Sequence, residues 1–161
     1  MILGMTPLTF VHVVISLVAI AAGLAWLAKL VRGSQRRGVT DLFLITTLAT
    51  TVTGFLFPIT VVTPAVAVGF VSLVLLAAAF IAHYMQHLSG AWRGVYVITA
   101  IAALYLNVFV LVVQAFQKVP ALNALAPTGS EPVFAFTQGL VLCAFILAGV
   151  FSMRRFHPMV A

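Results

Sequence analysis

The sequence predicts an all-α protein, a polytopic transmembrane helix bundle of five spans in one domain, residues 1–161, with the amino terminus outside and the carboxyl terminus in the cytoplasm. Hydrophobic residues make up 64% of the chain and charged residues only 6%, whereas about a quarter of the residues in soluble proteins are charged. The mean hydropathy is +1.26. The apolar residues form runs long enough to cross a bilayer, and most basic residues flank these runs on one side.

The first expected span covers residues 8–31, because about 20 mainly apolar residues cross the hydrocarbon core. It carries His12 and Ser16 one turn apart near its start. No Lys or Arg precedes it, and it is longer than the core of a signal peptide, so we expect the protein to retain it as an anchor. The connector 32–40 is basic and contains two glycines, which is typical of a loop.

The second expected span, 42–57, is rich in threonine and ends before Pro58. Thr40 is expected to cap this helix, and Asp41 suits the positive end of its dipole. Because a threonine hydroxyl can bond a carbonyl of its own preceding turn, we assign the threonines to helix packing. The third span, 64–88, begins at the next proline, so the two spans should form a tight hairpin.

The fourth expected span, 94–117, follows the interfacial pair Trp92 and Arg93, and the bundle should be organised around it. At helical spacing, one stripe of this span is small and polar. Its members are Tyr96, Ala100, Ala103, Asn107, Val110, Gln114 and Gln117. A carboxamide needs hydrogen-bond partners and the hydrocarbon core holds no water, so Asn107 should face neighbouring helices or a wet cavity.

The fifth expected span covers residues 132–153 and carries Gln138 near its beginning. The connector before it, 118–131, contains prolines, a glycine and small polar residues, which favours a loop. Ser130 is the expected cap of the last helix. We find no internal repeat and no second domain.

The distribution of basic residues between the connectors determines the orientation of the spans in the membrane. Those on the predicted cytoplasmic side are Lys29, Arg32, Arg36, Arg37, Arg93, Arg154 and Arg155, and only Lys118 falls on the other side. An odd number of spans puts the termini on opposite sides, so the amino terminus is predicted outside. The net charge of +6 is thereby explained by orientation, and because the basic residues form no continuous patch we expect no nucleic-acid partner.

Four polar side chains within the spans form the candidate site. At a rise of about 1.5 Å per residue, His12, Gln114 and Gln138 fall in the outer half of the membrane and Asn107 falls near its centre. Two interpretations stay open. The four are interhelical polar contacts that hold the bundle together, or they line a cavity that binds or passes a small apolar or amphipathic molecule.

The sequence contains few residues suited to catalysis. The only acidic residues, Asp41 and Glu131, are expected at opposite membrane faces, which excludes a paired-carboxylate mechanism. No phosphate-binding glycine loop is present, and the single cysteine, Cys143, excludes an intrachain disulfide. We therefore expect no enzyme activity, no cofactor and no metal site.

The histidines leave one weaker alternative, a haem or metal protein. His12 and His83 are expected about 15 Å apart along the membrane normal, so one chain cannot hold a haem between them. His83 and His87 stand one turn apart and could both reach one metal ion, with only Asp41 nearby as a third ligand. Such a site would therefore need histidines from more than one chain.

Three segments are distinctive as sequences, 53–58 (TGFLFP), 105–114 (YLNVFVLVVQ) and 118–132 (KVPALNALAPTGSEP). They resemble segments of small uncharacterised bacterial multi-pass inner-membrane proteins. The resemblance implies a location in the bacterial cytoplasmic membrane and supports the helical architecture, and it carries no activity with it.

The sequence thus predicts a non-enzymatic small integral membrane protein, an accessory or self-associating subunit of a membrane complex. Its partners would be the lipid bilayer and either further copies of itself or a larger membrane complex. The chain has almost no mass outside the membrane, and its distinctive residues suit helix packing. Binding or transport of a small apolar or amphipathic molecule is the alternative.

Overall fold

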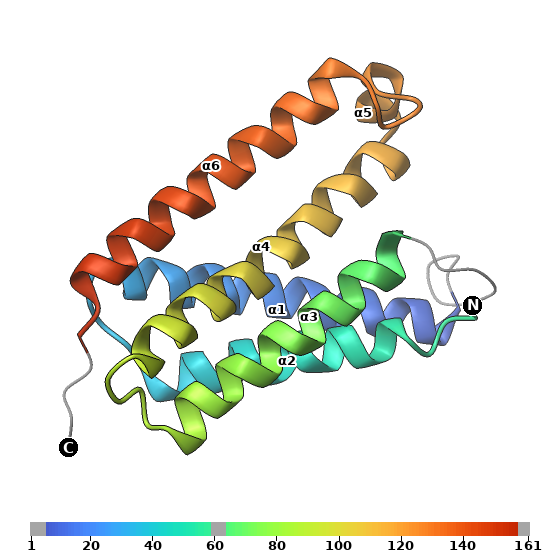
Figure 1. Ribbon diagram of the computed structural model, residues 1–161. Coiled ribbons are helices and arrows are strands. Elements are labelled where there is room, and N and C mark those ends of the chain that lie inside the picture. The colour runs from blue at the N-terminus through green and yellow to red at the C-terminus, as the bar shows by residue number, and fades with distance from the viewer. Residues whose placement is uncertain (1–5, 59–63, 158–161) are drawn as a thin grey trace.

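The computed structural model describes residues 6–58 and 64–157, and within these ranges every regular element is helical. The helices are α1 (Pro7–Val31), α2 (Arg37–Gly54), α3 (Pro64–Phe80), α4 (Trp92–Lys118), α5 (Pro120–Leu125) and α6 (Pro132–Arg155), and a π-helical segment, η1 (Ile81–Met85), continues α3 (Figure 1). The all-α prediction is therefore confirmed for the described part of the chain.

Four described segments are long and apolar enough to cross a membrane, namely α1, Ala65–Met85, α4 and α6. They are compatible with a small integral membrane protein. Helix α2 is not among them, because its 18 residues include Arg37, Asp41 and six threonines, which make it more polar than the others. The fifth span and the orientation therefore stay predictions. The predicted turn between the second and third spans lies outside the described residues.

The start of α2 differs from the prediction. The helix begins at Arg37, and Arg36 stands in extended conformation at the cap position without a side-chain capping bond. Thr40 is completely buried and accepts a hydrogen bond from Gln35 Nε2 at 3.1 Å. The predicted Thr40 cap was wrong, because the connector side chain of Gln35 uses its hydroxyl instead.

The connector before α6 also differs from the predicted loop, because it contains the short helix α5. Pro120 begins α5, at a position where the missing N–H costs nothing. Helix α6 has Glu131 at its cap position and no side-chain capping bond, so the predicted Ser130 cap was wrong. The Glu131 carboxylate instead accepts bonds from the backbone N–H groups of Thr128 (2.9 Å) and Ser130 (3.0 Å).

Acidification is expected to loosen this turn. The hydrogen bonds, that of the Thr128 N–H foremost, hold the pKa of the Glu131 carboxyl below its ordinary value. A lowered folded-state pKa stabilises the fold above the unfolded-state pKa, and the contribution is lost as pH falls through the folded-state pKa. An NMR titration in detergent should place the Glu131 midpoint below the ordinary value for a glutamate side chain. Glu131→Gln is the control, and a midpoint at or above that value would contradict these bonds.

The tightest packing joins α1, α2 and α4. Trp26 of α1 is only 1% exposed and stacks on Phe43 of α2, with ring centroids 4.9 Å apart. About one turn earlier, a Cβ added to Gly23 would collide with Leu104 Cδ1 of α4 and lie 2.9 Å from the Phe43 ring. The absence of a side chain at Gly23 therefore lets the three helices approach closely.

Helices α4 and α6 run side by side, and toward α5 the pair diverges from the other helices. Figure 1 shows the pair rising toward α5 and away from α1, α2 and α3. Helix α4 has fully buried residues from Tyr96 to Leu104 and again at Phe116, but none between 105 and 115. Helix α6 packs mainly on α4 and to a lesser extent on α1. The buried residues of α6 are Gln138, Phe145 and Ser152. The second half of α4 is therefore less enclosed than the first half.

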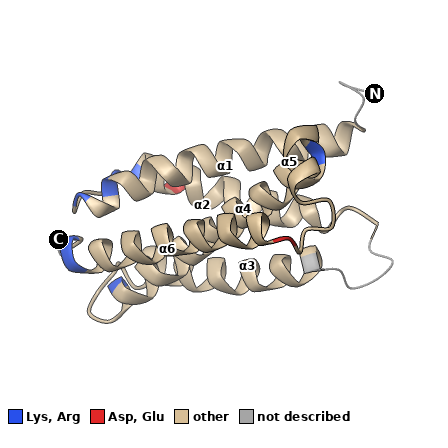
Figure 2. Cartoon of the chain, turned by 90° about the horizontal axis from the view of Figure 1, so that it is seen from above, with Lys and Arg blue, Asp and Glu red and all other residues tan. Residues whose placement is uncertain are grey.

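Lys and Arg gather at one end of the fold, where α1 and α6 finish and α4 begins, with one exception near α5 (Figure 2). Two contacts join the segments there. A Cβ on Gly33, which has φ +76°, would lie 2.8 Å from the carbonyl oxygen of Arg155. Arg93 Nη1 donates to the carbonyl oxygens of Met153 (3.0 Å) and Phe156 (2.6 Å). We call this region the basic end.

Candidate functional site

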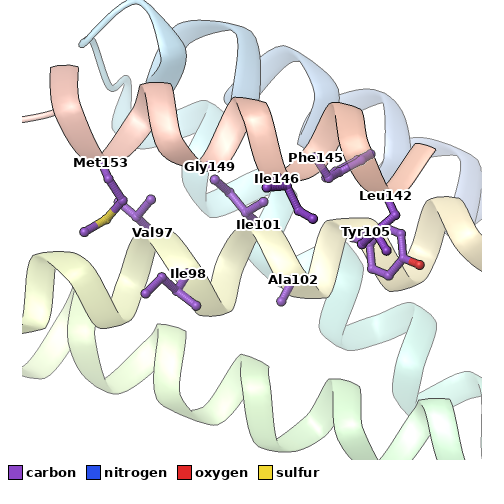
Figure 3. A pocket seen from close by; sticks show the side chains of 10 residues that line it. All are labelled: Val97, Ile98, Ile101, Ala102, Tyr105, Leu142, Phe145, Ile146, Gly149 and Met153. Carbon is purple, nitrogen blue, oxygen red and sulfur yellow. The ribbon is translucent and has the colours of Figure 1, made fainter. Parts of the chain in front are cut away.

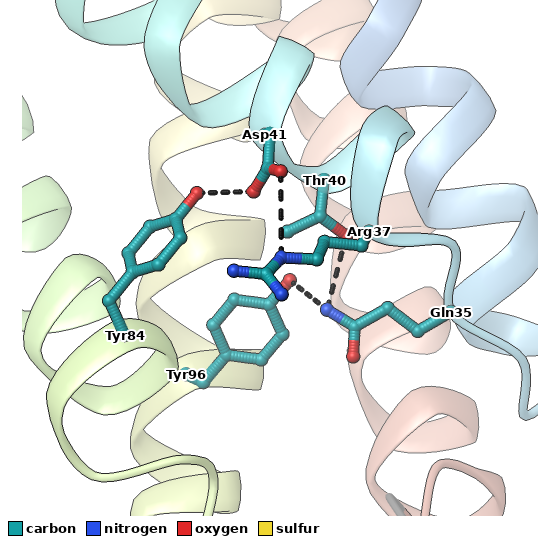
Figure 4. Close-up of polar contacts among 6 residues, drawn as sticks. All are labelled: Gln35, Arg37, Thr40, Asp41, Tyr84 and Tyr96. Carbon is teal, nitrogen blue, oxygen red and sulfur yellow. Dashed lines mark hydrogen bonds and ion pairs between the residues drawn. The ribbon is translucent and has the colours of Figure 1, made fainter.

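A buried polar cluster lies beside the basic end (Figure 4). Trp26 Nε1 donates to the Tyr96 hydroxyl at 2.9 Å, and Gln35 Nε2 donates to the same hydroxyl at 3.0 Å. Tyr96 has no exposed surface, so water cannot replace these donors. Since Gln35 also bonds Thr40, the cluster joins α1, its connector, α2 and α4. We name these four residues the Tyr96 cluster.

An acidic contact adjoins the Tyr96 cluster. The Tyr84 hydroxyl donates to Asp41 Oδ1 at 2.5 Å, and Arg37 Nε lies 4.0 Å from Asp41 Oδ2 (Figure 4). The Arg37 side chain is 85% exposed, so its ion pair is screened and contributes at most about 1 kcal/mol. The phenol bond is the stronger tie, and it attaches the segment after α3 to α2.

Tyr84 and its neighbour His83 are carried by the π-helical segment η1, a type of irregularity that is frequent at functional sites. The His83 ring stacks on Tyr96, with centroids 5.2 Å apart and planes at 23°. Its Nδ1 is buried without a hydrogen-bond partner in the described chain. His87 and Leu88 follow with φ of 47° and 60°, a conformation that is unfavourable for residues with a side chain. This segment is therefore locally strained.

The chemistry of the Tyr96 cluster is that of a structural junction. Its donors and acceptors are phenol, indole, amide and hydroxyl groups that bond one another, and none is a nucleophile placed beside a base. Among the described residues, no group of three or more His, Cys, Asp or Glu side chains could hold a metal ion. Sequence reasoning missed Trp26 and Gln35. The available signal was Tyr96 itself, because a phenol in an apolar run needs a partner.

His12, one of the four predicted site residues, joins α1 to α2. Its Nδ1 lies 2.8 Å from the Thr53 hydroxyl, and its ring meets the Phe57 ring edge-on at 5.3 Å. No hydrogen bond of the described chain links His12 to the other three predicted site residues. The structure therefore gives His12 a partner from a neighbouring helix.

The other three predicted site residues lie on α4 and α6. Gln138 is buried, and its Nε2 donates to the Phe109 carbonyl oxygen at 3.2 Å, which bonds α6 to α4. Asn107 is half-buried, and its Nδ2 has no hydrogen-bond partner in the described chain. Gln114 is exposed two turns further along α4. Gln138 is thus bonded through its Nε2, although its Oε1 is buried without a partner in the described chain, and the Asn107 Nδ2 has no partner there either.

An apolar groove of about 230 Å³ runs between α4 and α6 (Figure 3). It is lined by Val97, Ile98, Ile101, Ala102, Tyr105, Leu142, Phe145, Ile146, Gly149 and Met153. None of the four predicted site residues lines it. A smaller hollow of about 200 Å³ lies at the other end of the pair, where Phe116 and Phe134 face the connector. A cavity shared by His12, Asn107, Gln114 and Gln138 stays a prediction.

Comparison of the chain with protein-family models, with curated proteins and with solved structures found no match. The predicted resemblance to bacterial inner-membrane proteins therefore stays a prediction.

Proposed function

We propose that this protein is a non-enzymatic small integral membrane protein of the bacterial inner membrane that acts as a self-associating or accessory subunit. The observation that carries the proposal is Asn107, which lies within a membrane-length helix and whose Nδ2 is buried without a hydrogen-bond partner in the described chain. An amide in hydrocarbon gains from any interhelical partner, so this residue favours association with another helix.

The depth of Asn107 strengthens the argument. It lies 11 positions before Lys118 at the end of α4, which corresponds to about 16 Å along the helix and therefore to the middle of a core of about 30 Å. Water at the membrane surface does not reach that depth. The surrounding half of α4, between residues 105 and 115, is not fully buried by its own chain, which leaves room for a partner helix.

A second copy of the chain suits this face for a chemical reason. A carboxamide carries both a donor and an acceptor, so two Asn107 side chains that turn outward across a two-fold axis can satisfy each other, including the Nδ2 that is buried without a partner in the single chain. The exposed Gln114 lies two turns away on the same stripe and adds a second such pair. A homodimer through Asn107 and Gln114, in the half of this stripe that the chain itself does not fully bury, is therefore the form of self-association that we propose.

Asn107→Leu is expected to weaken self-association in mild detergent. An interhelical polar contact contributes about 0.6 to 2 kcal/mol, so the apparent dissociation constant should rise roughly 3- to 30-fold. Analytical ultracentrifugation of the purified protein over a concentration series measures this. Thr137→Val is the matched control, because the Thr137 hydroxyl already donates to Val133 of its own helix and its loss should leave association unchanged.

Two outcomes would count against this proposal. A wild-type protein that stays monomeric and carries no other protein through purification would remove its support. A compound that co-purifies with the wild type and is lost from Asn107→Leu, without a change in assembly, would favour the small-molecule alternative instead. Mass spectrometry of the purified protein distinguishes the two.

We also propose that α2 crosses the membrane as a fifth span, with the amino terminus outside. Helix α2 pairs with α1 over most of its length, from His12 beside Thr53 to Trp26 beside Phe43. Its 18 residues extend for about 27 Å, close to the thickness of the core. Its low apolarity comes largely from threonines, and those that are buried face other helices rather than lipid. The buried threonines are Thr40, Thr47, Thr50 and Thr51.

Thiol labelling tests this topology in a background where Cys143 is replaced by serine. Five spans put Ser34→Cys and Ser89→Cys on the cytoplasmic side and Thr128→Cys outside. An impermeant maleimide should therefore label only Thr128→Cys in spheroplasts, and all three after permeabilisation. If Ser89→Cys is labelled from outside while Ser34→Cys is not, α2 does not cross and the orientation of the later spans is reversed.

A further inference from the structure

The basic end holds more positive charge than the chain can neutralise. The sequence has only two acidic residues. Asp41 lies beside Arg37, and the Glu131 carboxylate is bonded to the turn before α6. Arg154 and Arg155, at the end of α6, are exposed and have no carboxylate partner among the described residues. These two charges can therefore attract an external anion.

The apolar groove between α4 and α6 leads to this end. Figure 3 shows Met153 at one end of its lining and Leu142 and Tyr105 toward the other. Leu142 and Met153 are about 16 Å apart along the helix, which is half of a core of about 30 Å, or one leaflet. At the Met153 end, Arg93 bonds the Met153 carbonyl oxygen and so adds a third positive charge to those of Arg154 and Arg155.

The two exposed arginines are not equivalent toward the groove. At about 100° per residue, both arginines lie more than 100° around the helix from the mean direction of the α6 residues that line the groove, so only their contacts distinguish them. The Arg155 guanidinium is in fact held over the Phe151 ring, 5.9 Å from its centroid. Arg154 is therefore the arginine that can reach an anion above the groove.

We propose that this groove binds one anionic phospholipid, with an acyl chain along the apolar lining and the phosphate on Arg154. The groove is lined by apolar and aromatic side chains along one leaflet, which suits an acyl chain. The planar guanidinium suits a phosphate, and the unbalanced positive charge selects an anionic over a zwitterionic headgroup. Arg93 fixes the end of α6, where Arg154 directly follows the lining residue Met153.

The test is native mass spectrometry of the purified full-length protein, titrated with phosphatidylglycerol or with phosphatidylcholine. Phosphatidylglycerol should bind more tightly than phosphatidylcholine. Arg154→Gln should weaken the affinity for phosphatidylglycerol about fivefold, the effect expected for one basic residue near the membrane surface, and Arg154→Lys should retain most of that affinity. Arg155→Gln removes the same charge from the same helix end and should bind nearly as the wild type does.

A second variant tests the acyl chain independently of charge and of any folding defect in Arg154→Gln. Gly149→Phe fills the groove and should abolish retention of both lipids, whereas Gly139→Phe, where an added side chain meets nothing within 4 Å, should not. Equal binding of the two lipids would overturn the proposal, as would equal losses from Arg154→Gln and Arg155→Gln. Displacement of the lipid by excess inorganic phosphate would show a free-anion site instead.

Discussion

Trp26→Ala is expected to destabilise the protein more than any other single truncation in its core. The change empties the space between α1, α2 and α4 and removes one of the two donors to the buried Tyr96 hydroxyl. Truncations of this size cost about 3–5 kcal/mol in soluble proteins. The lower end, about 3 kcal/mol, applies here because lipid is as apolar as the core and only packing and hydrogen bonding are lost.

Unfolding in mixed micelles with increasing dodecyl sulfate, followed by circular dichroism, measures this loss. Trp26→Phe keeps a ring against Phe43 but lacks the donor, and should cost only about 1 kcal/mol. Trp92→Ala is the matched control, because Trp92 is 36% exposed and should change stability by about 0.5 kcal/mol or less. Equal losses from Trp26→Ala and Trp92→Ala would mean that the Tyr96 cluster does not hold the helices together.

Gly23→Ala should be the second most damaging change, although it adds a single methyl group. The new methyl would overlap Leu104 Cδ1 and crowd the Phe43 ring, and overpacking of this kind costs about 1–3 kcal/mol. Both neighbours are themselves completely buried, which limits how far they can move.

Gly139→Ala gives the comparison for that experiment. An added Cβ meets nothing within 4 Å there, so better helix propensity should leave stability unchanged or raise it by up to about 1 kcal/mol. The same denaturation assay applies to both variants. A Gly23→Ala protein as stable as Gly139→Ala would show that α1 and α4 are not in close contact at that point.

The four long apolar helices were predictable because each is a long apolar run between polar connectors, whereas the six-residue α5 was not. The stripe expected to face the bundle begins with Tyr96, Ala100 and Ala103, and all three are completely buried. The ends of helices were less predictable. The sequence around Thr40 predicts a helix cap. In the structure the Thr40 hydroxyl instead accepts a hydrogen bond from Gln35, and this bond can form only after α1 and α2 have paired.

The contacts of the candidate site could not be predicted, because each depends on how one helix is rotated against another. His12 meets Thr53 across 41 positions of the chain, and the Gln138 amide finds the carbonyl oxygen of Phe109 rather than another side chain. The π-helical segment that carries His83 has no signature in a run of apolar residues. Composition and spacing identify the polar residues within the spans, but they do not predict the hydrogen-bond partners of those residues.

The Trp26 and Tyr96 pair has a consequence for the order in which the protein is made. The two residues are 70 positions apart, so at a synthesis rate of about 5–20 residues per second the tryptophan waits roughly 4 to 14 seconds for its acceptor. Phe43 emerges after roughly 1 to 3 seconds and can cover the Trp26 ring in the meantime. The α1–α2 hairpin is thus the first unit able to form. Helix α4 is made later and packs against the surface of α1 that contains Gly23 and Trp26.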